Sequence, residues 1–176
     1  MPQMIPAWIN ARLTPVEKLD VHQRGLKHPA ISVFVMSGRQ VLLQQRALNK
    51  YHSGGKWANT CCTHPHWDEA FEACAHRRLH EEMGISGVEL QHADQIEYRA
   101  DVGGGLTEHE VVEVYIAQVP IDLPLSLNPE EVAAARWVDL DTLSSDVAAH
   151  PERYSVWLEI YLRDHSDRIF GTLPPK

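Results

Sequence analysis

The sequence has few cysteines and no arrangement of them that suggests a disulfide framework. Only three occur in 176 residues, Cys61, Cys62 and Cys74, and two of these are adjacent. Small secreted domains that depend on disulfides carry a denser and usually even set of cysteines. We therefore expect free thiols and a reducing compartment, the cytoplasm.

Long apolar segments are also missing. No stretch approaches the roughly 18 apolar residues of a membrane-spanning helix, and the first eight residues lack the features of a secretory leader. Basic residues are outnumbered by acidic ones, 16 to 24, which gives a formal net charge of −8. This charge disfavours nonspecific binding to nucleic acid or to an anionic membrane. An anionic ligand would need a local group of basic side chains or metal ions.

Internal repeats, low-complexity segments and linkers are absent, so residues 1–176 are predicted to form one domain with its own core. Apolar clustering and alternation predict strands at 30–35, 41–45, 96–100, 108–119 and 135–140. Helices are predicted over 68–84, near 141–145 and, with a looser pattern, over 155–170. Strands mixed with helices indicate a mixed α/β (α+β) fold. Residues 1–29 show a mixed pattern.

The predicted helix at 68–84 carries charges on its inner face. A helical wheel gives an apolar stripe made of Phe71, Cys74, Ala75 and Leu79. Arg78 and Glu82 project within about 20° of the centre of this stripe. Charged side chains are rarely buried unless they are paired or bound to something. The middle of this face is therefore expected to belong to a site.

A thiol and an imidazole stand two residues apart in the segment 59–65. If this segment is extended, Cys62 and His64 point to the same side. A metal or a cation nearby would shift the pKa of the Cys62 thiol and allow acid–base or nucleophilic chemistry. The alternative is a buried structural cysteine, which is the interpretation that we keep for Cys61 and Cys74.

Histidines and carboxylates that could bind a metal ion recur along the chain. Glu108 and Glu110 head the otherwise apolar face of the predicted strand at 108–119, and their spacing lets both reach one ion. The candidate ligands are His22, His28, His64, Glu108 and Glu110, a donor set that suits Mn²⁺, Zn²⁺ or Fe²⁺. The alternative is a scatter of surface histidines, because the chain has 11. No role is assigned to His52, His66, His76, His80, His92, His109, His150 or His165.

Basic side chains form a third candidate group, made of Lys18, Arg46, Lys50 and Arg78. Such side chains beside a divalent ion commonly hold a diphosphate. Solvated surface charge is the alternative, although the position of Arg78 on the wheel speaks against it. Tyr98 and Trp157 either offer aromatic faces to a cationic intermediate or pack in the core.

Residues 63–85 resemble the Nudix box, G-x5-E-x7-R-E-U-x-E-E-x-G-U, in which U is a bulky apolar residue. Thr63 stands in place of the first Gly, and Arg78 replaces the second Glu. Glu69 and Arg77 follow at the expected spacing. Hydrolases of this superfamily normally use the glutamate cluster to hold Mg²⁺ and activate water. A cation within the cluster should weaken the binding of several metal ions, so hydrolysis is disfavoured.

The same departures are typical of the type 1 isopentenyl diphosphate isomerases, and the wider sequence resembles that family over about residues 15–163. The matching elements, in the family's order, are Glu17-Lys18 before His22, R-A-x-x-K at 46–50, W-x-N-[ST]-x-C-x-H-P at 57–65, Tyr98-Arg99-Ala100, Glu108-x-Glu110 and residues 154–157. Residues 53–55 depart from the aromatic or Pro that many members have before the Gly. The resemblance implies a Nudix fold with a mixed sheet between helices. It also implies a cytoplasmic enzyme of isoprenoid biosynthesis that interconverts isopentenyl and dimethylallyl diphosphate through a tertiary carbocation.

The resemblance further implies a role for each candidate residue. Cys62 and Glu110 form the proton-transfer pair, assisted by Tyr98, and Trp157 stabilises the carbocation. One metal ion, Mn²⁺, Zn²⁺ or Mg²⁺, is held by His22, His28, His64, Glu108 and Glu110. A Mg²⁺ ion that enters with the diphosphate is held by Glu82 and the Cys62 carbonyl, and the phosphate oxygens are gripped by Lys18, Arg46, Lys50 and Arg78. We expect no flavin, nucleic-acid or membrane partner, and a monomer or weak homodimer.

Two other functions are considered. A Nudix hydrolase of a nucleoside diphosphate derivative would release phosphate or a nucleotide, and Thr63 and Arg78 speak against it. A catalytically silent metal-binding or regulatory domain should lack the Cys62 and Glu110 pair, yet both are present. Residues 1–14 and 164–176 have no predicted role.

Overall fold

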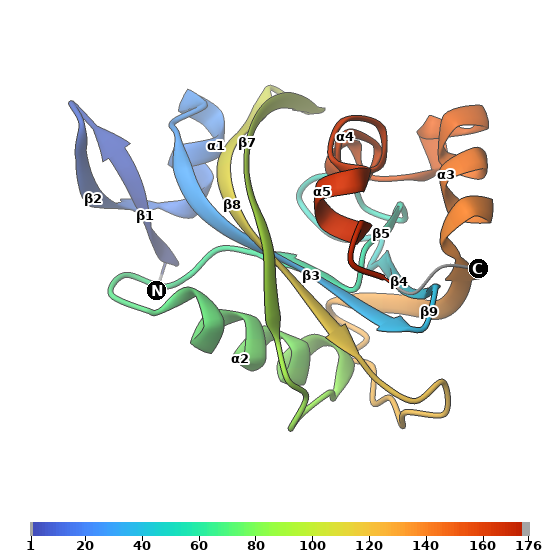
Figure 1. Cartoon of the computed structure of the whole chain (residues 1–176). Coiled ribbons are helices and arrows are strands. Elements are labelled where there is room, and N and C mark those ends of the chain that lie inside the picture. Colours follow the sequence, from blue (N-terminus) through green and yellow to red (C-terminus); the bar gives the residue numbers. More distant parts are fainter. Residues whose placement is uncertain (1, 174–176) are drawn as a thin grey trace.

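The computed structural model describes residues 2–173. Met1 and residues 174–176, which belong to the two ends of the chain without a predicted role, lie outside it. Within that range a seven-stranded mixed sheet forms the centre, with helices on both faces (Figure 1). Its strands are β3 (His28–Ser37), β4 (Gln40–Arg46), β5 (Trp57–Ala58), β6 (Cys61–Thr63), β7 (Gln91–Gly103), β8 (Leu106–Gln118) and β9 (Val132–Asp139). A separate hairpin is formed by β1 (Met4–Ile9) and β2 (Arg12–Glu17). The helices are α1 (Lys18–Arg24), α2 (Phe71–Met83), α3 (Leu140–Ala149), α4 (Val156–Asp164) and α5 (Ser166–Phe170), with a 3-10 turn at Pro151–Arg153.

The main path through the sheet has the strand order β5-β4-β3-β8-β7, while β6 pairs with β3 and β9 pairs with β4. β3 and β8 are parallel, and β7 and β8 form an antiparallel hairpin. The predicted mixed sheet between helices is therefore confirmed. Each predicted strand overlaps an observed one, although β7 begins five residues earlier than the predicted strand at 96–100, at Gln91. The loosely helical run at 155–170 is interrupted at His165, which separates α4 from α5.

Two apolar clusters pack against the sheet, one on each face. Beneath it, α2 contributes Cys74, Ala75, Leu79 and Met83 to a cluster with Ile31, Val33 and Val35 of β3. On the other face, α3, α4 and α5 pack over Phe34, Val112 and Val114. The placement of Phe71 in the apolar stripe is wrong, because this first residue of α2 is 36% exposed and lies outside the buried cluster.

The alternation in β8 places its two carboxylates on the buried side. Glu108, Glu110, Val112 and Val114 are buried, and the residues between them are less so. Glu110 lies opposite His28 on β3 and opposite Tyr98 on β7. The register of three neighbouring strands therefore brings an imidazole, a carboxylate and a phenol side by side. His109, between the two carboxylates in the sequence, faces the other side of the strand, where its Nε2 contacts Glu97 at 3.1 Å.

The amino-terminal hairpin was not predicted. β1 and β2 pair through the whole of both strands, and Asn10 and Ala11 at their turn have φ angles of 50° and 62°, as a tight hairpin turn requires. Pro6 lies opposite Pro15, and proline within a run of residues argues against a strand. The hairpin and α1 share a small core of Ile5, Ala7, Val16 and Val21. This core holds α1 in place beside β8.

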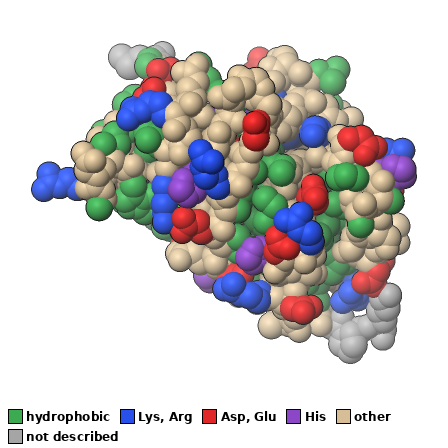
Figure 2. Space-filling view, turned by 90° about the horizontal axis from the view of Figure 1, so that it is seen from above, with side chains coloured by type: hydrophobic (Ala, Val, Ile, Leu, Met, Phe, Trp, Pro, Cys, Tyr) green, Lys and Arg blue, Asp and Glu red, His purple; other side chains and the backbone are tan. Residues whose placement is uncertain are grey.

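The surface mixes charges of both signs. Figure 2 shows basic and acidic side chains interspersed on the face seen from above, so the net charge of −8 does not form one acidic patch there. Of the helices in residues 2–173, none has the length and apolar character needed to cross a membrane.

An ion pair fastens the loop before α2 to that helix. Arg77 donates from Nε and Nη2 to the two carboxylate oxygens of Glu69 at 2.6 and 2.7 Å, and the backbone N–H of His66 donates to Glu69 at 2.8 Å. The hydrogen bonds from Arg77 lower the pKa of Glu69 to about 2. Glu69 and Arg77 are two of the Nudix-box residues that match the resemblance, and their ion pair joins the loop to the helix.

The substitution Glu69→Gln is expected to lower the free energy of unfolding by about 1 kcal/mol at pH 7, because the pair is partly exposed to solvent. The folded pKa lies below the unfolded value of 4.5, so this contribution is present above that pH and is lost as the pH falls toward 2. Urea unfolding of both proteins at pH 7 and pH 3 should show a difference that narrows at pH 3. Glu72→Gln, an exposed position on the same helix, is the control, and a difference that is constant with pH would contradict the assignment.

Candidate functional site

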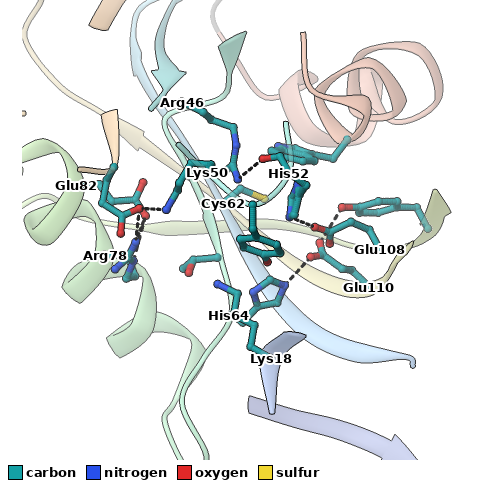
Figure 3. Close-up of a pocket in the computed structure, with 15 residues that line it drawn as sticks. Lys18, Arg46, Lys50, His52, Cys62, His64, Arg78, Glu82, Glu108 and Glu110 are labelled. Carbon is teal, nitrogen blue, oxygen red and sulfur yellow. Dashed lines mark hydrogen bonds and ion pairs between the residues drawn. The ribbon is translucent and has the colours of Figure 1, made fainter. Parts of the chain in front are cut away.

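A pocket with an empty volume of about 440 Å³ lies where β4, β6, β7, β8 and the starts of α1 and α4 converge (Figure 3). The side chains predicted to transfer protons, stabilise the carbocation, hold Mg²⁺ or bind the diphosphate all line it, namely Cys62, Tyr98, Glu110, Trp157, Glu82, Lys18, Arg46, Lys50 and Arg78. His64 and Glu108 line it as well. The structure therefore brings together residues that are distributed over most of the chain.

His22 on α1 and His28 at the start of β3 present the same nitrogen to the site. His22 Nδ1 lies 2.6 Å from the carbonyl of Lys18, and His28 Nδ1 lies 2.7 Å from the carbonyl of Leu26. Because a carbonyl only accepts, Nδ1 of each ring carries the proton and Nε2 of the neutral ring keeps its lone pair. Among the described residues, His22 Nε2 finds no hydrogen-bond partner. These are imidazoles held ready to bind a ligand through Nε2.

The other predicted ligands surround these nitrogens. His64 Nε2 lies 2.8 Å from Glu110 Oε1 and 3.1 Å from His28 Nε2. Glu108 Oε1 lies 3.6 Å from His22 Nε2. One potential ligand atom from each of His22, His28, His64 and Glu108 lies within 4.8 Å of the others. Glu110 joins them through its contacts with His64 and, at 3.6 Å, with His28.

This group has the chemistry of a divalent metal site. Glu108 and Glu110 are each only 2% exposed. Burial opposes the ionisation of Glu110, yet hydrogen bonding to its carboxylate, including the bond that Tyr98 donates, lowers its pKa. Within the described part of the chain, Oε2 of Glu108 is buried without a hydrogen-bond partner. Buried carboxylate oxygens and imidazole lone pairs that converge on one point fit a borderline divalent ion.

Cys62 lies on β6 opposite Ser32 of β3 and borders the same pocket as His64, as its spacing predicted. Burial, followed by the charge of Glu110, raises the pKa of the Cys62 thiol well above its usual range. The side chain is therefore a protonated thiol at neutral pH. Cys61 and Cys74 lie in the apolar cluster between the sheet and α2, in agreement with their predicted structural roles.

Two aromatic side chains complete this end of the pocket. The hydroxyl of Tyr98 donates to Glu110 Oε2 at 2.9 Å. Trp157, at the start of α4, is 2% exposed, and its Nε1 donates to Asn59 Oδ1 at 3.2 Å. Asn59 in turn donates from Nδ2 to Ser32 Oγ at 2.8 Å. The indole ring is thereby fixed in orientation next to the thiol and the carboxylate.

The opposite end of the pocket is basic. Arg78 donates to Glu82 Oε1 from Nε and Nη2 at 3.0 and 2.6 Å, so the two residues share the inner face of α2 as predicted. Lys50 and Arg78 both contact Glu131, with Arg78 Nη2 at 3.2 Å. Burial, and then the charges of Lys50 and Arg78, lower the pKa of Lys18 to about 8. Such crowding of positive charge is relieved by an anionic ligand.

Some residues of the site were missed by the sequence reasoning. His52 was given no role, yet its Nε2 lies 3.0 Å from Glu108 Oε1. Gln44 donates to Glu82 Oε2 at 2.8 Å, and Glu131 lies between two of the cations. Asn59 is part of a matched motif, but its contact with Trp157 joins positions 98 residues apart in the chain. None of these contacts follows from local spacing.

The chain matches the family model of the NUDIX domain over residues 26–158. A protein named isopentenyl-diphosphate Delta-isomerase from Cereibacter sphaeroides is 62% identical over 173 residues, which is 98% of each chain. Proteins of the same name from Dinoroseobacter shibae and Rhodobacter capsulatus are 60% and 56% identical and are covered over 98% and 96% of both chains.

Solved structures with low sequence identity have the same fold. A MutT NUDIX hydrolase from Burkholderia pseudomallei has a TM-score of 0.62 at 21% identity, over 79% of this chain and 98% of its own. A Nudix hydrolase from M. smegmatis has a TM-score of 0.59 at 23% identity, over 85% and 89%. The Nudix fold is thus confirmed.

Addition of Mn²⁺ to metal-free protein is expected to raise its melting temperature, and a chelator should reverse the change. An ion at about 100 times its dissociation constant stabilises the folded state by about 2.7 kcal/mol, which is roughly 5–10 °C for a chain of this size. His28→Ala should abolish the shift and His109→Ala, on the other face of the sheet, should keep it. Calorimetry measures the melting temperature of each variant with and without Mn²⁺. An equal shift in the two variants would exclude the histidine cluster as the binding site.

Proposed function

We propose that this protein interconverts isopentenyl and dimethylallyl diphosphate. The chain belongs to the isopentenyl-diphosphate Delta-isomerase family and has its NUDIX domain. The observation that carries this proposal is the pocket in which Cys62, Glu110 and Tyr98 lie together, with basic side chains at the opposite end. An alkene isomerisation needs proton-transfer groups, and a diphosphate ester needs cations. Both are supplied by one cavity.

The reaction moves one proton between two carbons. A proton is added to the terminal carbon of the alkene, which gives a tertiary carbocation, and another is removed from the carbon next to the oxygen-bearing one. Cys62 and Glu110 would act on opposite sides of the alkene, one as the acid and the other as the base. The raised pKa of Cys62 and the lowered pKa of Glu110 leave the resting pair with a single proton. In each turnover the acid would give its proton to the alkene and the base would take a different proton from the substrate, so the pair would again hold a single proton, now on the other partner.

Tyr98 and Trp157 would serve the intermediate. The hydroxyl of Tyr98, bonded to Glu110 Oε2, orients this carboxylate and offers a path for its proton. Trp157 would stabilise the carbocation through its π face. Its almost complete burial and its bond to Asn59 also keep water away, and water would convert the cation to an alcohol.

His22, His28, His64, Glu108 and Glu110 would hold a divalent ion, which we propose to be Mn²⁺, Zn²⁺ or Mg²⁺. When bound, the ion would supply the positive charge that offsets the two buried carboxylates and keeps Glu110 in place. Glu82 and the carbonyl of Cys62 would hold a Mg²⁺ ion that enters with the diphosphate. No flavin is needed for a proton transfer of this kind.

The diphosphate would be held by Lys18, Arg46, Lys50 and Arg78. Glu131 contacts Lys50 and Arg78, which would position these two cations for the diphosphate. The hydrolase alternative has less support, because Arg78 occupies a glutamate position of the Nudix box and pairs with Glu82. We further propose that the enzyme works in the cytoplasm, in isoprenoid biosynthesis, as a monomer or weak homodimer without nucleic-acid or membrane partners.

Purified protein incubated with isopentenyl diphosphate and Mg²⁺ in D₂O should form deuterated dimethylallyl diphosphate, as followed by NMR. Cys62→Ala and Glu110→Gln are each expected to lose activity by roughly 10²–10⁴-fold, the usual contribution of a positioned acid or base. Cys61→Ala, a neighbouring cysteine in the apolar core, is the matched control and should stay active. Unchanged substrate with wild-type protein, together with phosphate release from nucleotides, would favour the hydrolase instead.

Lys50→Gln is expected to raise KM for isopentenyl diphosphate and to weaken inhibition by inorganic pyrophosphate, each by roughly 10–100-fold. This range corresponds to the loss of one hydrogen bond to a charged group, about 1.5–3 kcal/mol. Lys56→Gln, at the end of the same loop and outside the pocket lining, should leave both constants unchanged. Steady-state kinetics measure the two effects, and an unaltered pyrophosphate constant in Lys50→Gln would remove Lys50 from the diphosphate site.

A further inference from the structure

His52 is a buried histidine that lies against the proposed metal site but belongs to none of the groups with a proposed role. It follows the basic element at 46–50, in the loop between β4 and β5, and it is 7% exposed. Its Nε2 lies 3.0 Å from Glu108 Oε1, and Figure 3 shows the ring directed at this carboxylate. We infer that His52 is a positioning residue, which donates a hydrogen bond to Glu108 Oε1 and so directs the other oxygen, Oε2, to the metal ion.

The contacts of the ring determine which nitrogen carries the proton. An ionised carboxylate accepts and cannot donate, so a neutral imidazole facing Glu108 must have its N–H at Nε2. The remaining nitrogen, Nδ1, then has to accept, and the hydroxyl of Ser53 lies 3.2 Å from it. Ser53 can donate this bond because a hydroxyl rotates to suit its partner. Both ring nitrogens are therefore satisfied by a single tautomer.

This tautomer separates His52 from His22 and His28, whereas Nε2 of His64 also lies against a carboxylate, that of Glu110. His22 and His28 direct an unprotonated Nε2 toward the cluster, whereas Nε2 of His52 is occupied by its proton and by Glu108. The compact group of potential ligand atoms within 4.8 Å of one another includes Glu108 and does not include His52. Within residues 2–173, Glu108 Oε2 is buried and finds no hydrogen-bond partner. Oε1 of Glu108, which also lies 3.6 Å from His22 Nε2, is thus held by His52, and Oε2 is the oxygen that no described residue satisfies.

The loop around His52 is built to hold the ring. Ser53 has a positive φ of 52°, and a Cβ on Gly54 would lie 2.5 Å from the carbonyl oxygen of Leu48. Only glycine fits that approach, so the loop is closely packed on itself. The ring of His52 is also nearly perpendicular to Tyr51 and Trp157, with centroids at 4.4 and 6.0 Å. Its rotation is restricted on two sides.

The backbone of His52 connects the metal end of the pocket with the basic end. Arg46 Nη2 donates to the carbonyl of His52 at 3.2 Å, and the same guanidinium lies 5.3 Å from the ring centroid of Trp157. Glu108, His52 and Arg46 therefore form a continuous chain of contacts. Hydrogen-bond donors that orient a metal ligand typically contribute about 10–100-fold to metal affinity. We expect an effect of this size from His52.

The test is the affinity of metal-free protein for Mn²⁺ in the absence of substrate, measured by EPR of the free ion. His52→Leu fills the space without a donor and should bind Mn²⁺ roughly 10–100-fold more weakly. His52→Gln places an amide N–H near the position of Nε2 and should recover the affinity to within about threefold of wild type. His109→Ala is the control on the opposite face of β8. Melting temperatures in chelator establish that each variant is folded, and His52→Ala replaces the leucine variant if that protein does not fold.

The possible results separate this inference from the proposed metal site, on which it rests. Weak binding by His52→Leu together with recovery in His52→Gln supports the positioning role, because a residue that only fills space would not be rescued by a donor. Wild-type affinity in His52→Leu overturns it. Equal losses in both variants overturn it as well, since His52 would then be a ligand or a packing residue. A wild-type protein that binds no Mn²⁺ would overturn the metal site and the role of His52 together.

Discussion

The burial of two carboxylates at the head of β8 is the constraint on which the rest of the site depends. Glu108 and Glu110 lie on the apolar side of the strand, where an uncompensated charge is very unfavourable. These charges are compensated by imidazoles from distant parts of the chain. The imidazoles come from α1, the start of β3, the β4–β5 loop and the segment after β6. The small hydrophobic core of the amino-terminal hairpin matters for the same reason, because it holds α1 against β8.

The two ends of the pocket differ in the charged groups that line them. Its inner end pairs carboxylates with histidines and a protonated thiol, which suits proton transfer and metal binding. Its outer end is basic, although the whole chain has a formal charge of −8. Burial, and then repulsion by Lys50 and Arg78, lower the pKa of Lys18. Glu82 pairs with Arg78, and Glu131 contacts both Lys50 and Arg78, so these basic side chains are held in place.

Much of this arrangement was predictable because it follows local periodicity. Alternation along 108–119 identified the buried carboxylates, and the helical wheel identified Arg78 and Glu82 on the inner face of α2. Both patterns depend only on the geometry of one element. The resemblance to a family then connected the elements into one site. The β1–β2 hairpin was not predicted because Pro6 and Pro15 argue against a strand at each of these segments. In the structure the two strands pair with these prolines opposite each other.

The sequence by itself determined which side chains face inward, since strand and helix periods are local properties of the backbone. It also determined the chemical types available: three thiols, eleven imidazoles and an excess of carboxylates. Only the tertiary structure decided which of these meet. The parallel pairing of β3 with β8 places His28 opposite Glu110, and a tightly folded loop places His52 on Glu108. Contacts of this kind depend on strand register and loop packing between segments far apart in the chain, and no periodicity within a single element encodes them.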